Sequence, residues 1–141
     1  MATTIVSGID KPVSLVRDVG VFYPEGTTAL IAGSGNVANA SAAATLTPTS
    51  TTTAYISGFE LTGAGATAGS VVTVTVAGLL GGTRSYTYVF STGALVVNTP
   101  LIVSYYPPLP ASAINTAIVV TCPAGGAGNT NMTAVAHGFY A

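Results

Sequence analysis

Residues 70–90, SVVTVTVAGLLGGTRSYTYVF, alternate apolar and hydroxyl side chains in two runs that a glycine-rich break separates. The apolar members that share one side of each run are Val72, Val74 and Val76, then Tyr86, Tyr88 and Phe90. A period of two residues is typical of a strand with one buried face, so the pattern predicts a hairpin that turns at LLGGT. Each run alone is β-prone, free of proline and nearly uncharged, which is the composition of an aggregating segment. The hairpin therefore needs a fold that covers its apolar side.

The rest of the chain after residue 54 repeats this organisation of short strands between Gly- and Pro-containing breaks. We predict strands at 55–62, 70–79, 84–92, 99–106, 116–122 and 130–140. Two further inward faces are Leu101, Val103 and Tyr105, then Ile118, Val120 and Cys122. The last strand is apolar on both sides, so we expect it to be central or covered by a neighbour. The fold class predicted is all-β, a jelly-roll-like antiparallel β-sandwich with an extended N-terminal arm.

The first part of the chain has a different composition. We assign residues 1–53 to an N-terminal arm and linker that contributes one or two strands, and residues 54–141 to the sandwich domain. Most of the charged residues lie in the arm, and after residue 25 only Glu60 and Arg84 follow. The segment YYPPLP, residues 105–110, is interpreted as a rigid crossover loop rather than a polyproline ligand.

Charge is scarce in this chain. Charged residues are 5% of the sequence, against roughly 25% in typical soluble domains, and the formal net charge is −1. Either neighbouring subunits cover much of the surface, which we favour, or a hydroxyl-rich β surface is sufficient for solubility. Three basic residues cannot neutralise a run of phosphates, so nucleic acid is not an expected partner. We find no signal peptide and no apolar run long enough to span a membrane.

The residues that carry chemistry are few. Cys122 is the single cysteine, and its place in an apolar alternation predicts a small buried side chain. His137 is the single histidine, and a nucleophilic triad would require a serine or Cys122 and an acid beside it, whereas Glu60 is the lone acid of the strand region. One histidine and one cysteine cannot form a zinc site within a chain, although histidines from three subunits could meet on a three-fold axis. We assign no catalytic, cofactor-binding or metal-binding residue, expect no cofactor, and expect that the protein is not an enzyme.

Two glycine motifs and three tyrosines complete the candidates. GSGNVA (33–38) and GAGATA (63–68) have the shape of a dinucleotide motif, but neither follows a hydrophobic strand and opens a helix, so both are interpreted as turns. Tyr55, Tyr105 and Tyr106 could stack on sugars if they were exposed, which leaves a glycan-binding role open.

Residues 53–141 combine Gly/Thr-rich strands, the segment PPLPAS, and the turn GAGNTN before a final apolar strand. In this pattern they resemble the capsid decoration, or cement, proteins of tailed bacteriophages. The resemblance implies a jelly-roll-like sandwich, a homotrimer, and a structural role on the outer capsid surface of a virion assembled in the host cytoplasm. It also implies that the partner is the major capsid protein and that the N-terminal arm helps to clamp neighbouring subunits. The alternative is a head- or tail-fibre receptor-binding module.

Overall fold

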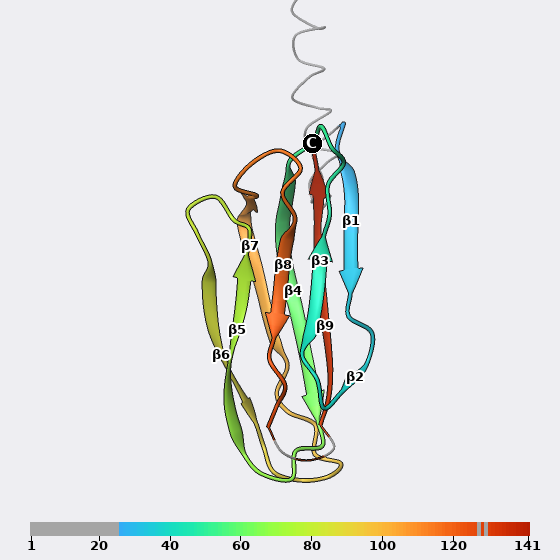
Figure 1. Ribbon diagram of the computed structural model, residues 1–141, viewed down its shortest axis with the longest axis vertical. Coiled ribbons are helices and arrows are strands. Elements are labelled where there is room, and N and C mark those ends of the chain that lie inside the picture. Colours follow the sequence, from blue (N-terminus) through green and yellow to red (C-terminus); the bar gives the residue numbers. More distant parts are fainter. Residues whose placement is uncertain (1–25, 127, 129) are drawn as a thin grey trace, which may run out of the picture.

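A computed structural model describes residues 26–126, 128 and 130–141, and these residues form two antiparallel sheets packed face to face (Figure 1). The five-stranded sheet contains β1 (Thr28–Gly33), β9 (Asn131–Tyr140), β4 (Ala54–Ala64) and β7 (Leu101–Pro110) in that order, and the short β2 (Val37–Ala38) also pairs with β9. The four-stranded sheet contains β3 (Ala42–Leu46), β8 (Ile118–Cys122), β5 (Ser70–Ala77) and β6 (Arg84–Phe90) in that order. The predicted all-β sandwich is confirmed.

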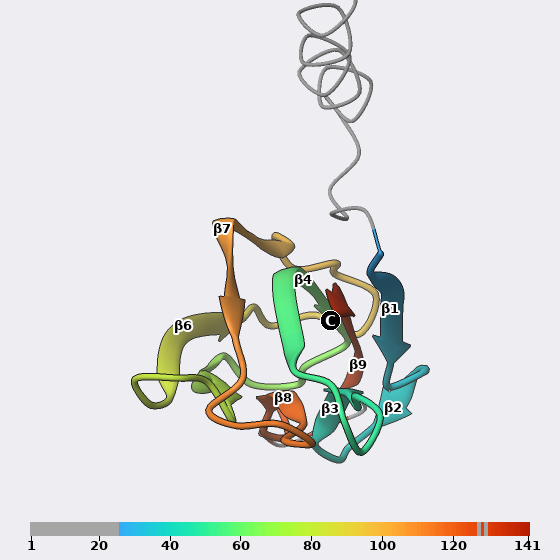
Figure 2. The same ribbon diagram turned by 90° about the horizontal axis from the view of Figure 1, so that it is seen from above.

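The strand order is that of a jelly roll. With β2 set aside, the chain passes from one sheet to the other at every connection except β5–β6, which is a hairpin within the four-stranded sheet. The two layers and the crossings between them are visible when the molecule is seen from above (Figure 2). The hairpin predicted for residues 70–90 is therefore present, with Val74 opposite Tyr86 and Val72 opposite Tyr88.

The core lies between the two sheets and is made by the faces that alternation predicted. Val74, Val76, Tyr88 and Phe90 are buried there together with Ile118, Val120 and Cys122. Val72, Tyr86, Leu101, Val103 and Tyr105 pack against this core and are partly buried. The last strand, β9, is central, between β1 and β4, as its two apolar sides predicted.

The strands before residue 54 are more numerous than the sequence indicated. Three strands lie within residues 28–46, and they belong to both sheets: β1 and β2 pair with β9, and β3 pairs with β8. The inward side chains of β3 are Ala42, Ala44 and Leu46, all buried. Alanine side chains are small and only weakly hydrophobic, so the alternation in β3 is hard to detect in the sequence. From the sequence the segment is therefore interpreted as a linker. Residues 1–25, the first part of the arm and linker expected at residues 1–53, lie outside the described residues.

The segment YYPPLP is not a crossover loop, and that prediction was wrong. It forms the second half of β7, where Leu109 pairs with Ile56 and Pro110 with Tyr55, after a cis peptide bond between Tyr106 and Pro107. Proline is tolerated in this strand because β7 is at the edge of its sheet and pairs only with β4, so a missing N–H need not remove a ladder bond.

Candidate interaction surface

The five-stranded sheet has one side turned away from the four-stranded sheet, which we call the outer face. Its side chains follow from the register, because residues opposite each other in antiparallel strands point to the same side. Glu60 on β4 lies opposite Ile102 on β7 and opposite Val135 on β9. We call these three residues the central row. Glu60 is exposed and Ile102 is 66% exposed, so a single carboxylate stands between two aliphatic side chains.

The next residues along the strands continue this apolar character. Ile31, on β1, is 76% exposed and lies opposite His137, which is two residues along β9 from Val135 of the central row. Beyond it, the rings of Tyr55 and Phe139 are stacked, with centroids 4.9 Å apart and an angle of 11° between their planes. Glu60 is the only Asp, Glu, Lys or Arg in the described strands of this sheet. The outer face is therefore a nearly uncharged surface with exposed aliphatic groups and, beyond them, a stacked aromatic pair of which Phe139 is buried and Tyr55 is half-buried.

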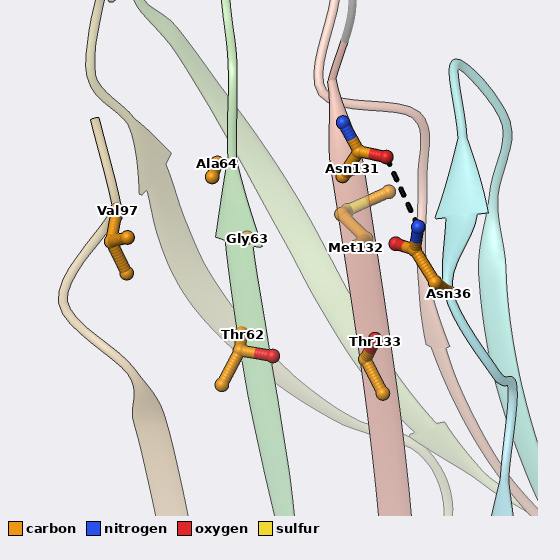
Figure 3. Close-up of a pocket in the computed structure, with 8 residues that line it drawn as sticks. All are labelled: Asn36, Thr62, Gly63, Ala64, Val97, Asn131, Met132 and Thr133. Carbon is orange, nitrogen blue, oxygen red and sulfur yellow. Dashed lines mark hydrogen bonds between the residues drawn. The ribbon is translucent and has the colours of Figure 1, made fainter. Parts of the chain in front are cut away.

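A shallow hollow of about 190 Å³ lies at the end of β4 and the start of β9 (Figure 3). Thr62 and Thr133 lie beside each other on its floor, Val97 stands on one side and Asn36 on the other. The Asn36 Nδ2 donates a hydrogen bond of 3.1 Å to Asn131 Oδ1, which fixes that side of the hollow. Hydroxyls, amides and aliphatic groups line the hollow, and none of its lining residues has an ionisable side chain.

His137 is held by a bulge in β4. The pairing of β4 shifts between Ile56 and Gly58, and the Ser57 Oγ between them donates a 3.0 Å hydrogen bond to the His137 carbonyl oxygen. The same Oγ lies 3.0 Å from His137 Nδ1, so the ring nitrogen is the donor in that contact. The ring lies over Gly58, where an added Cβ would come within 2.7 Å of the imidazole Cε1.

This Ser57–His137 pair differs from a nucleophilic site. The serine proton is directed to a backbone carbonyl rather than to the imidazole, and Ser57 is buried. Within the described residues, no hydrogen bond or ion pair joins Glu60 to His137, so the structure brings a serine but not an acid to the histidine. The sequence did not indicate Ser57, because the contact depends on a bulge that shifts the register of two strands distant in sequence. The pair fixes the ring orientation on the outer face.

The three candidate tyrosines do not share one face. Tyr106 is 94% exposed and Tyr55 is stacked on Phe139, both on the outer face. Tyr105 points to the core side of β7, where its hydroxyl lies 2.7 Å from that of Tyr86. Burial and this hydrogen bond raise the pKa of Tyr105. Arg84 lies over the Tyr105 ring, with its Cζ 5.8 Å from the centroid, and so makes a cation–π contact within its own chain.

The two glycine motifs lie in connections between strands. Residues 33–38 run from the end of β1 into β2, and residues 63–68 leave β4 towards β5. Gly35 and Gly65 have positive φ angles of 65° and 88°. Neither motif precedes a helix in the described part of the chain, and this fits their interpretation as turns.

Cys122 is fully buried in the core, as its place in the alternation predicted, and its thiol lies 3.5 Å from Met132 Sδ. Burial raises its pKa from 9.0 to about 11. Within residues 26–126, 128 and 130–141, no group of three or more His, Cys, Asp and Glu side chains could hold a metal ion. The thiol is therefore a packing group in the core.

A pH-dependent loss of stability follows from Cys122. In the unfolded chain the thiol ionises near its ordinary pKa of 9.0, whereas in the folded chain it stays protonated until about 11, so the unfolded state loses its proton first as the pH rises. The free energy of unfolding should therefore be lower at about pH 10.5 than at about pH 8. Urea denaturation at both values measures this. Cys122→Ala should lose less stability over the same interval, and an equal loss in both proteins would contradict the assignment.

Comparison of the chain with protein-family models, with curated proteins and with solved structures finds no match. In the part of the chain that the structure describes, no helix is long and apolar enough to cross a membrane.

Proposed function

We propose that this chain is a structural virion protein, a capsid decoration protein that binds the outer surface of an assembled phage head. In this role it contacts neighbouring major capsid subunits and stabilises the contact between them. The resemblance of residues 53–141 to cement proteins supports the proposal, and it also favours a homotrimer. Jelly rolls occur in viral capsid and lectin domains, but a fold alone does not decide function.

The observation that carries the proposal is the outer face. Apolar side chains exposed together on a surface mark a site that another surface covers. Here Ile31 and Ile102 are mostly exposed, and Glu60 is the one charge among the strands of that sheet. Binding through such a face removes apolar area from water and desolvates only one ion, so it avoids most of the penalty for burying charges. A protein partner with an apolar surface fits these side chains.

The mechanism follows from mass action. A protein that binds only where two capsid subunits are adjacent has no site on a free subunit, so every bound copy favours the assembled shell over its parts. The gain grows with the number of copies on the shell. No reaction is needed for this role.

Substitution of Ile102 tests whether the outer face is the binding surface. Ile102→Lys places a charge in the central row and should weaken binding to heads of the encoding phage by at least about tenfold, because the interface would bury an ammonium. Co-sedimentation with heads that lack the chain measures this. The matched control is Thr45→Lys, an exposed position on β3 in the other sheet, which should bind like the unmodified protein.

Three other outcomes would contradict the assignment. Equal binding of Ile102→Lys and the unmodified chain would remove the outer face as the contact surface. Weaker binding of Thr45→Lys alone would assign the contact to the hydroxyl-rich side of the four-stranded sheet. Failure of the unmodified chain to bind heads, together with retention on a glycan array, would favour the receptor-binding module.

A further inference from the structure

The strand β6 is at the edge of the four-stranded sheet. In the described part of the chain it pairs only with β5, and it lies at the margin of the molecule in both views (Figures 1 and 2). An edge strand presents a row of unpaired N–H and C=O groups, and another chain can pair with them. Natural proteins protect such edges with prolines, charges, bulges or covering segments.

The other three sheet edges carry protection of this kind. The β7 edge contains Pro107, Pro108 and Pro110, and none of these residues has an N–H to offer. The β1 and β3 edges lie in contact with each other across the sandwich and close that side of the molecule (Figure 2). Strand β3 is also short, with five residues.

Strand β6 also meets β7 across the sandwich, where the Tyr86 and Tyr105 hydroxyls lie 2.7 Å apart, but in the described part of the chain no backbone pairs with its free side. Its seven residues, RSYTYVF, include no proline, and the only charge is Arg84 at the first position, which lies over Tyr105 of its own chain. On the side of the sheet that faces away from the core, Val89 is 54% exposed and Val71, opposite it on β5, is 69% exposed. The edge and the apolar pair beside it form one uncovered strip.

We infer that β6 pairs antiparallel with β6 of a second copy, about a two-fold axis at Thr87. Thr87 is the middle residue of the strand, so this register pairs all seven residues and places Arg84 opposite Phe90 of the second copy. The two Arg84 side chains are then about 20 Å apart along the paired strands, which is beyond the screening length of roughly 8–10 Å. Two copies of β6 can therefore pair along their full length without bringing their Arg84 charges close together.

Pairing with a second copy would also keep this edge from pairing without limit. A two-fold contact uses the same strand on both copies and leaves no further edge, so growth stops at the pair. Such pairing is independent of the proposed capsid binding, which uses the other sheet. It is compatible with a homotrimer, because two trimers joined in this way would form a hexamer.

Charge substitutions at Thr87 test this pairing. Thr87 is exposed and points away from the core, so Thr87→Lys and Thr87→Glu should leave the fold intact. Across the two-fold axis each variant would place like charges directly opposite each other, which disfavours pairing. Native mass spectrometry at micromolar concentration should find the mass of the unmodified assembly halved in each variant. Mixing the two variants in equal amounts should restore it, since the opposed charges are then complementary.

Thr73→Lys is the matched control. Thr73 lies on β5, opposite Thr87 of β6. It points to the same side of the sheet and is exposed, but it lies one strand away from the edge. Its charge would be about 14 Å from that of the second copy, three strand spacings away, so the assembly should keep its mass. An unmodified protein that is monomeric, or whose mass neither Thr87 variant changes, would overturn the inference. Loss of mass in Thr73→Lys as well would contradict the proposed register.

Discussion

Replacing Phe90 by alanine is expected to lower the free energy of unfolding by about 3–5 kcal/mol. The ring is fully buried and meets Tyr88 edge-on, with centroids 5.1 Å apart. It also lies between the backbones of Gly63 and Gly125, where an added Cβ would come within 2.8 Å of the ring at either glycine. Gly63 belongs to β4, which pairs on both sides, so this backbone cannot move in to fill the space that the ring leaves. The cavity term then adds to the loss of hydrophobic burial.

Urea denaturation of Phe90→Ala beside Val89→Ala measures this effect. Val89 is the preceding residue of the same strand, but its side chain is 54% exposed on the opposite side of the sheet. Its truncation should cost less than about 1 kcal/mol. Similar losses in the two variants would show that Phe90 does not occupy the core position described above.

Replacing Gly138 by alanine is expected to destabilise the protein by about 3 kcal/mol or more, which is at the upper end of the cost of overpacking. Gly138 is buried in β9, between Leu30 on β1 and Ile56 on β4. An added Cβ would overlap with the carbonyl oxygen of Tyr55, and backbone on a paired strand cannot turn away as a side chain could. The methyl group would force β9 and β4 apart at the centre of the sheet.

Gly33→Ala is the control for this prediction, because Gly33 is a strand glycine of the same sheet with room for a methyl group. The nearest atoms to an added Cβ there are at 3.8 Å or more, which is ordinary contact. Since alanine restricts the unfolded chain, Gly33→Ala should be neutral or stabilising by up to about 1 kcal/mol. Thermal unfolding of both variants compares them, and a Gly138→Ala protein as stable as Gly33→Ala would contradict the strand packing described here.

Local alternation was enough to predict the strands after residue 54, apart from the second half of β7. In β5 and β6 the β-branched and aromatic side chains recur at every second position, so their buried sides could be read without a partner strand. In β3 the buried positions are Ala42, Ala44 and Leu46, and two alanines give too little contrast with the exposed residues between them. The second half of β7 was missed for a different reason, since prolines are typical of loops and only its position at an edge permits them there.

The outer face and the free edge of β6 could not be predicted in the same way. The central row depends on the register among β7, β4 and β9, which are distant in sequence, and so does the contact between Ser57 and His137. One signal was present in the sequence: Ile102 is aliphatic at a position that alternates with the inward Leu101 and Val103. The scarcity of charge was also visible, but only the structure shows which described side chains share a surface.

We propose that this chain recognises an assembled capsid surface, and one binding measurement tests this proposal most directly. The purified protein is mixed with expanded heads of the encoding phage, with unexpanded heads and with free major capsid protein, and the bound fraction is measured by co-sedimentation or by capture of the tagged chain. The proposed function predicts saturable binding to expanded heads and none to free capsid protein. Equal binding to free subunits, or no binding to any form of the capsid, would contradict it.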